Sequence, residues 1–363
     1  MPENKSHVPE EELVATPLSG AAGGVGGAVG GNQVEYELQT WAVEPAGGTG
    51  YVDDDVAVQQ FTQLEQVWRR FRRHRIALVG ATMLGIILLF AIIAPLLTRV
   101  GPTAIHLDWL SSDFNNPGDT GPTLANFPDR IMGVDTVGHS IWADVIYGGR
   151  ISLLIGVGAS LLTMIIGTSL GAISGYFGGW VDLLLQRFTD MMLSIPFLPL
   201  MIAISAIIEP NPALHQNAGF TITFIILAFS LLTWPGVARI VRSYYLTFRE
   251  QEFTEAAKAV GVNDFRIIFR HILPNTFGPI IVLFTLNVAG FITLEATLDF
   301  LGLGIDFPPT PTWGNLLTNA QDDLLIGHWW WATFPGLFLL LTVLAINFMG
   351  DGLRDALDVR SKE

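Results

Sequence analysis

Long apolar runs separated by polar segments make up most of the chain from residue 76 onward. The first run, residues 76–97, contains no charged residue. At about 1.5 Å per residue it can cross a hydrocarbon core roughly 30 Å thick. Five comparable runs follow. The pattern predicts an all-α membrane protein with six transmembrane helices, at about residues 76–98, 151–176, 181–208, 220–238, 276–294 and 329–349.

A polar region of different character precedes the first apolar run. Residues 1–57 are rich in Gly, Ala and Glu and include the run GAAGGVGGAVGG. Such a composition buries too little apolar surface to offset the entropy of ordering, so we predict a disordered acidic tail. Residues 58–75 then place aromatic and aliphatic residues at helical spacing, followed by five arginines. This pattern predicts an amphipathic helix lying in the headgroup region of the bilayer.

Charge orients the predicted helices. The net charge of −14 comes mostly from residues 1–60, and it argues against nucleic acid as a partner. If the N-terminus is cytoplasmic, sixteen of the 19 Lys and Arg residues lie on the inner side. We therefore predict a multi-pass protein of the cytoplasmic membrane with both termini inside. Residues 99–150 form an external loop, residues 151–350 a five-helix core, and residues 351–363 a cytoplasmic tail.

The polar segment between the fourth and fifth runs, residues 239–275, has the signals of a helix, a turn and a second helix. Gly261 can end the first helix because Gly accepts a left-handed conformation. Asn263 or Asp264 can cap the second helix, and Pro274 is expected to break the chain before the fifth span. One face of the first helix is predicted to carry Phe253, Ala256, Ala257 and Val260.

Six residues of this segment match the spacing EAA---G---------I-LP: Glu255, Ala256, Ala257, Gly261, Leu273 and Pro274. The position usually held by Ile is His271. The segment resembles that of permease subunits of the dipeptide/oligopeptide/nickel family of binding-protein-dependent ABC importers. The stretch from Ile131 to Val157 and the C-terminal third are similar to the same family, so the resemblance covers about residues 60–363. Val134, His139 and Ser140 depart from the family's GTDxxGRD pattern.

The resemblance implies a type I ABC importer permease fold with cytoplasmic coupling helices. It also implies the partners: a second homologous permease, two ABC ATPases that bind the coupling segment, and an external solute-binding protein. The chain has no GxxxxGK[ST] phosphate loop. ATP and Mg²⁺ are therefore expected on the partner subunits, and this chain is expected to be no enzyme and to hold no cofactor. Relatives carry peptides, nickel complexes, oligosaccharides or opines, and the cargo stays open among these classes.

Two groups of residues inside the spans suggest packing roles. Four glycines at four-residue spacing form one groove on a helix, which we interpret as a surface for close helix packing: Gly167, Gly171, Gly175 and Gly179. Asp182, Arg187 and Asp190 lie near the inner end of the third span. Because Arg187 and Asp190 are one helical turn apart, we favour a structural ion pair between them over a role in a transport pathway.

Other residues raise further possibilities. Glu295 and Asp299 are four residues apart at the outer end of the fifth span, where they either line the outer mouth and contact a cationic group of the substrate or are simply solvated. The seven His residues show no metal-ligand spacing, and the absence of Cys excludes thiolate sites, so no metal is expected. An ion-coupled secondary transporter or a membrane-embedded enzyme would require charged midspan positions, and the span centres are essentially uncharged.

Overall fold

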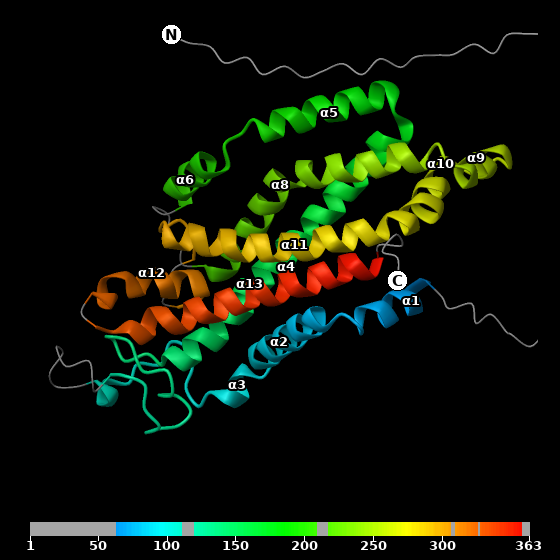
Figure 1. Cartoon of the computed structure of the whole chain (residues 1–363). Coiled ribbons are helices and arrows are strands. Elements are labelled where there is room, and N and C mark those ends of the chain that lie inside the picture. The colour runs from blue at the N-terminus through cyan, green and yellow to red at the C-terminus, as the bar shows by residue number, and fades with distance from the viewer. Residues whose placement is uncertain (1–62, 111–119, 209–216, 306–308, 326, 358–363) are drawn as a thin grey trace, which may run out of the picture. The chain divides into compact units, whose positions relative to one another are not determined.

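The computed structural model describes residues 63–110, 120–208, 217–305, 309–325 and 327–357 (Figure 1). Within these ranges the regular structure is helical, apart from one isolated β-bridge between Val134 and Ser140. This confirms the all-α prediction. The predicted tail, residues 1–57, lies outside the described residues.

Among the described residues, five helical stretches are long and apolar enough to cross a membrane. They are α2 (Arg75–Ile92), α4 (Ile141–Phe177), α8 (Ala218–Phe248), the continuous stretch Asp264–Phe300, and α13 (Trp329–Leu357). Shorter elements accompany them: α1 (Gln63–Phe71), α3 (Ala94–Leu97), η1 (Leu107–Trp109), α9 (Glu252–Ala259) and α12 (Trp313–Leu324).

The third predicted span is a bent pair of helices rather than the single helix that we expected. Helix α5 (Gly179–Leu193) and helix α6 (Phe197–Ile208) are inclined at 65° to each other. Pro196 separates them. Proline lacks a backbone N–H and disfavours helical geometry at the residue before it, so the helix ends at this point. Counted as one span, this pair brings the number to the six predicted.

Helix α4 is longer than the apolar pattern indicates. It begins at Ile141 rather than near residue 151 and runs for 37 residues, about 55 Å. The Ser140 side chain caps its first turn by accepting a hydrogen bond from the Ala143 N–H at 3.2 Å. Asp144 and Arg150 interrupt the apolar pattern, so the sequence did not indicate that residues 141–150 belong to this helix. The end of the predicted external loop is therefore helical.

The expected break at Pro274 is wrong. Helix α10 (Asp264–Arg266), a π-helical turn η2 (Ile267–Ile272) and α11 (Leu273–Phe300) follow one another without interruption. The N–H of Leu273 bonds to the carbonyl of Ile268, five residues back. A proline ring clashes with the carbonyl four residues earlier in a regular helix, and the wider π-turn relieves that clash.

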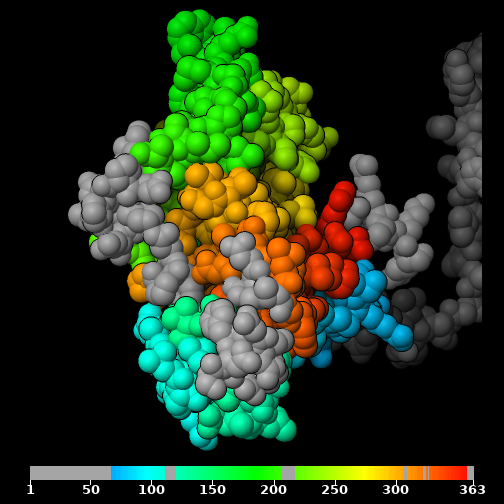
Figure 2. Space-filling model, turned by 90° about the vertical axis from the view of Figure 1, so that its left-hand side faces the viewer, coloured from blue at the N-terminus to red at the C-terminus, as the bar shows by residue number. Residues whose placement is uncertain are grey.

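Helix α4 packs along α8 and also against α11, while α13 packs against α2, α11 and α12. Figure 1 shows α1, α9, α10 and the end of α13 at one end of the bundle, and α3 and α12 at the other. Figure 2 looks onto that second end, where the cyan residues that follow α3 and the orange helix α12 lie at the surface. The helix–turn–helix predicted within residues 239–275 therefore lies at the same end as both described termini.

Three of the four glycines identified in the second span form the α4–α8 contact. A Cβ added to Gly167 would lie 2.7 Å from Val237 Cβ, and one added to Gly171 would lie 2.5 Å from the carbonyl oxygen of Ala238. Gly175 approaches Tyr245 Cβ in the same way, at 2.6 Å. The predicted packing role is wrong for Gly179. This residue begins α5 with φ +53°, and an added Cβ would meet no atom within 4 Å. Its role is conformational.

Candidate functional site

The helix–turn–helix segment, residues 252–272, is built around Gly261. Helix α9 ends in a pair of bonds that close its last turn: the Gly261 N–H donates to the Lys258 carbonyl at 2.9 Å, and the Val262 N–H donates to the Ala257 carbonyl at 3.1 Å. Gly261 has φ +81°, the left-handed conformation that this ending requires. A Cβ there would meet nothing within 4 Å. The backbone conformation, not space, requires glycine, as the sequence predicted.

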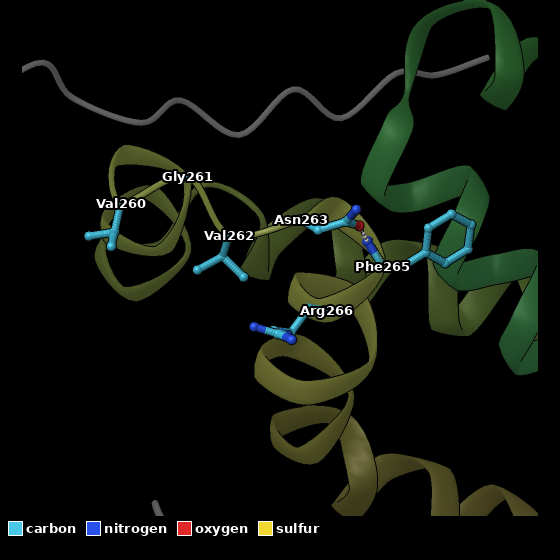
Figure 3. A pocket seen from close by; sticks show the side chains of 6 residues that line it. All are labelled: Val260, Gly261, Val262, Asn263, Phe265 and Arg266. Carbon is cyan, nitrogen blue, oxygen red and sulfur yellow. Dashed lines mark hydrogen bonds between the residues drawn. The ribbon is translucent and has the colours of Figure 1, made fainter.

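Asn263 starts the second helix of this segment. Its side-chain oxygen accepts a hydrogen bond from the Phe265 N–H at 2.9 Å (Figure 3). Of the two caps that the sequence allowed, the structure uses Asn263. The Asp264 carboxylate instead accepts a hydrogen bond from Tyr176 of α4.

Side chains from α4 and α8 hold this segment against the bundle. The Tyr176 hydroxyl donates to Asp264 Oδ1 at 2.6 Å, and the Lys258 ammonium lies 5.3 Å from the centre of the Tyr176 ring. The Tyr245 hydroxyl donates to the Ile268 carbonyl at 3.2 Å. Sequence reasoning missed these anchors because each joins residues far apart in the chain. The segment is therefore fixed at several points to the two helices that carry the bundle.

The two alanines of the predicted apolar face point in different directions. Ala257 is only 9% exposed and packs in a cluster with Tyr176, Tyr245 and Ile268. Ala256 is exposed to solvent. The predicted apolar face of α9 is therefore not a single surface. Ala257 faces the bundle and Ala256 faces solvent, because α9 lies against the bundle.

The outward surface of the segment is apolar at its tip. Val260 is 84% exposed and Phe265 is 62% exposed. The tip residues line a shallow hollow of about 660 Å³ (Figure 3): Val260, Gly261, Val262, Asn263, Phe265 and Arg266. Glu255 is exposed beside a second hollow that includes Lys258 and Arg249. Leu273 and Pro274 lie behind the tip, in the first turn of α11.

Glu295 and Asp299 do not line an outer mouth. They are 0% and 3% exposed. Ser152 of α4 donates to Glu295 Oε2 at 3.2 Å, while Asp299 accepts hydrogen bonds from the Ile305 N–H at 2.8 Å and from the Thr312 hydroxyl. These bonds fasten the end of α11 to α4 and to the chain that leads into α12. Both alternatives that the sequence left open, contact with the substrate and simple solvation, are therefore wrong, and the two carboxylates have a structural role.

The acidic residues of the third span form ion pairs with α8. Asp190 accepts a hydrogen bond from Arg239 at 2.6 Å, whereas the favoured partner, Arg187, is 3.9 Å away. Asp182 pairs with Arg242, with N···O distances of 2.5 and 2.6 Å. The structural interpretation holds, but the main partners are arginines one helical turn apart on another helix. A pattern within one helix could not reveal them.

Together these features define a multi-pass helical membrane protein that carries an anchored helix–turn–helix with an exposed apolar tip at one end. Residues 167–363 match the family of binding-protein-dependent transport system inner membrane components, and residues 62–117 match the N-terminal TM domain of oligopeptide transport permease C. The chain belongs to the family of binding-protein-dependent transport system inner membrane components.

Curated relatives match more than four fifths of the chain. The dipeptide transport system permease protein DppC of Alkalihalophilus pseudofirmus is 38% identical over 82% of this chain and 90% of its own length. The glutathione transport system permease protein GsiD of Escherichia coli is 38% identical over 83% of this chain and 92% of its own length. Among solved structures, a chain of the inward-facing MetNI methionine ABC transporter matches 59% of this chain and 96% of its own, with a TM-score of 0.45 and 17% identity.

Proposed function

We propose that this chain is one permease subunit of an ATP-driven, binding-protein-dependent importer of type I that carries peptides or related small solutes. The observation that carries the proposal is the helix–turn–helix segment, whose exposed apolar tip lies at one end of a helical bundle and which contacts α4 and α8 through Tyr176 and Tyr245. The names of the relatives, a dipeptide and a glutathione permease, support the peptide class of cargo.

The tip is suited to contact an ATPase. Ala256, Val260 and Phe265 are exposed apolar side chains on a segment that extends from the bundle. Exposed apolar side chains of this kind serve as anchors when a complementary groove covers them. Glu255 adds an exposed charge that can pair with a basic group of the same groove. Ala257 contributes from within, because its small side chain lets α9 lie close to the bundle.

Because the segment contacts the bundle at several points, it is expected to move together with the membrane helices rather than independently of them. Three isoleucines of η2 are fully buried: Ile267, Ile268 and Ile272. The turn η2 also continues directly into α11. A force on the tip is therefore transmitted to α11 through a continuous helix, and to α4 and α8 through Tyr176 and Tyr245. In this mechanism, closure of the ATPases moves these helices and switches the pore between inward-open and outward-open states.

The proposal requires partners that supply the remaining parts of the importer. A second, homologous permease completes the pore, two ABC ATPases bind ATP and Mg²⁺, and an external solute-binding protein delivers the cargo. In this proposal both termini and the helix–turn–helix segment face the cytoplasm. Two observations support it: α1, α9 and the end of α13 share one end of the bundle, and most of the Lys and Arg residues fall in the segments assigned to that side.

A charged residue at the tip tests the proposal. Val260→Asp should release the ATPases during purification and abolish uptake, because an unpaired charge would be buried in an apolar contact. The matched control is Val137→Asp, which places the same change on an exposed valine, 47% exposed, outside the helix–turn–helix segment. Full ATPase association and full uptake by V260D would show that the tip is not the contact.

A further inference from the structure

Helix α1 has two different sides. One side packs on the end of α13, where Phe71 is buried together with Ala77 and Ala356. The connection is reinforced by His74, which lies 3.3 Å from the Asp355 carboxylate. The other side faces away from the bundle and holds a hollow of about 320 Å³, lined by Trp68, Arg69, Arg72 and Arg73. Trp68 and Arg69 belong to the last turn of α1, and Arg72 and Arg73 follow in the turn between α1 and α2.

The hollow adjoins the start of the first candidate membrane span. Helix α2, the first candidate span, begins at Arg75, two residues after the last arginine of the hollow. Trp68 is 60% exposed at this level, and an exposed tryptophan is typical of the boundary between membrane and water. Directly beyond it, α2 exposes the apolar side chains of Ile76 and Val79. The arrangement places a cationic hollow above an apolar surface.

Two of the three arginines that line this hollow have no acidic partner among the described residues. The side chains of Arg72 and Arg73 are exposed, and neither forms an ion pair with an acid among the described residues. The guanidinium group presents a planar set of donors that matches a phosphate group. The chemistry of the hollow therefore calls for a phosphate-bearing anion.

We propose that the α1 hollow binds the headgroup of an anionic phospholipid. Arg72 and Arg73 hold its phosphate, Trp68 packs against the glycerol region, and an acyl chain lies along Ile76 and Val79. A free phosphate ion would use only the arginines and would leave this apolar surface uncovered. Because the phosphate is held beside α1 and the acyl chain lies along α2, the bound lipid joins these two helices. The proposal is independent of the ATPase contact at the other helices.

A thermal-shift titration of the full chain in nonionic detergent tests the site. Dioctanoyl phosphatidylglycerol should raise the Tm by about 3 °C at ten times its dissociation constant, whereas dioctanoyl phosphatidylcholine and inorganic phosphate should raise it little. The double variant Arg72→Gln/Arg73→Gln should lose most of the phosphatidylglycerol shift. The matched control is Arg99→Gln, which removes one exposed arginine beyond the opposite end of α2 and should keep the full shift.

Three outcomes would overturn the proposal. An equal shift with inorganic phosphate would identify a simple anion site, and an undiminished shift in R72Q/R73Q would place the lipid elsewhere. The third concerns the acids at Asp53, Asp54 and Asp55. If phosphatidylglycerol has no effect on the wild-type chain but stabilises the full-length variant Asp53→Asn/Asp54→Asn/Asp55→Asn, the acidic tail occupies the hollow instead of a lipid.

Discussion

Asp182 of α5 and Arg242 of α8 form a two-point ion pair in which the guanidinium Nε and Nη2 donate to the two carboxylate oxygens at 2.5 and 2.6 Å. Ser174 of α4 donates to the same carboxylate at 2.5 Å. Helix α5 packs less extensively on the bundle than its neighbours do. This partly buried pair is therefore one of the main connections that hold the first half of the bent span in place.

Removing one partner of this pair should destabilise the protein. Asp182→Asn leaves Arg242 without its counter-charge in a partly buried site, and we expect a loss of about 1–3 kcal/mol in the free energy of unfolding. Arg187→Gln is the control, because Arg187 is 76% exposed and 3.9 Å from Asp190, so its loss should have little effect. Thermal melts of both variants in one detergent provide the comparison. Equal melting temperatures would contradict the assigned role.

The close contact of α4 with α8 should make Gly171 intolerant of even one added carbon. Gly171→Ala would place a Cβ 2.5 Å from the Ala238 carbonyl oxygen and force the helices apart, at a cost of about 1–3 kcal/mol. The same change at Gly236, where an added Cβ meets nothing within 4 Å, should be neutral or stabilising by up to about 1 kcal/mol. Denaturation curves of G171A and G236A measure the difference, and similar curves would refute the contact.

Gly261 should respond to conformation rather than to size. Gly261→Val forces a β-branched residue to φ +81°, which should distort the end of α9 and reduce ATPase association and uptake at unchanged membrane levels. Gly261→Asn also adds a side chain, but Asn tolerates the left-handed region. G261N should therefore retain most of the ATPase association and most of the uptake. If G261N fails as severely as G261V, the requirement is for a small residue at the contact and not for the turn.

The two alanines of α9 should fail in different ways when enlarged. Ala256→Trp adds bulk on the exposed side, so the permease should keep its Tm but lose co-purifying ATPases. Ala257→Trp inserts bulk into the buried cluster and should lower the Tm itself. Melting temperature and ATPase co-purification are measured on the same two preparations. A stable A257W variant, or an A256W variant that melts early, would reverse the assignment of the two faces.

Cysteine labelling tests the sidedness of the bundle. The chain contains no Cys, so single cysteines can be introduced at two exposed positions. Lys258 is expected on the cytoplasmic side and Leu124 on the external side. In intact cells an impermeant maleimide should label Leu124→Cys and not Lys258→Cys, whereas both should react after permeabilisation. Labelling of K258C alone in intact cells would invert the topology.

Much of the architecture follows directly from the sequence because membranes impose simple rules. Apolar runs of sufficient length predicted the spans, and Gly261 with its neighbours predicted the turn of the helix–turn–helix segment, since only the local backbone conformation matters there. The length of an apolar run and the left-handed turn at Gly261 depend only on residues close together in the chain. These two features can therefore be read from short stretches without knowledge of the fold.

Tertiary structure decided which side chains meet. The main partners of Asp182 and Asp190 lie on α8, and the carboxylates of Glu295 and Asp299 are buried. Ala257 packs against the bundle, whereas its neighbour Ala256 is exposed. A wide turn before α11 accommodated Pro274, where local rules required a break. In each case the outcome depends on how helices distant in sequence pack together. Periodicity gives the face of a helix, but only the neighbouring helices determine whether that face is buried, paired or left open to a partner.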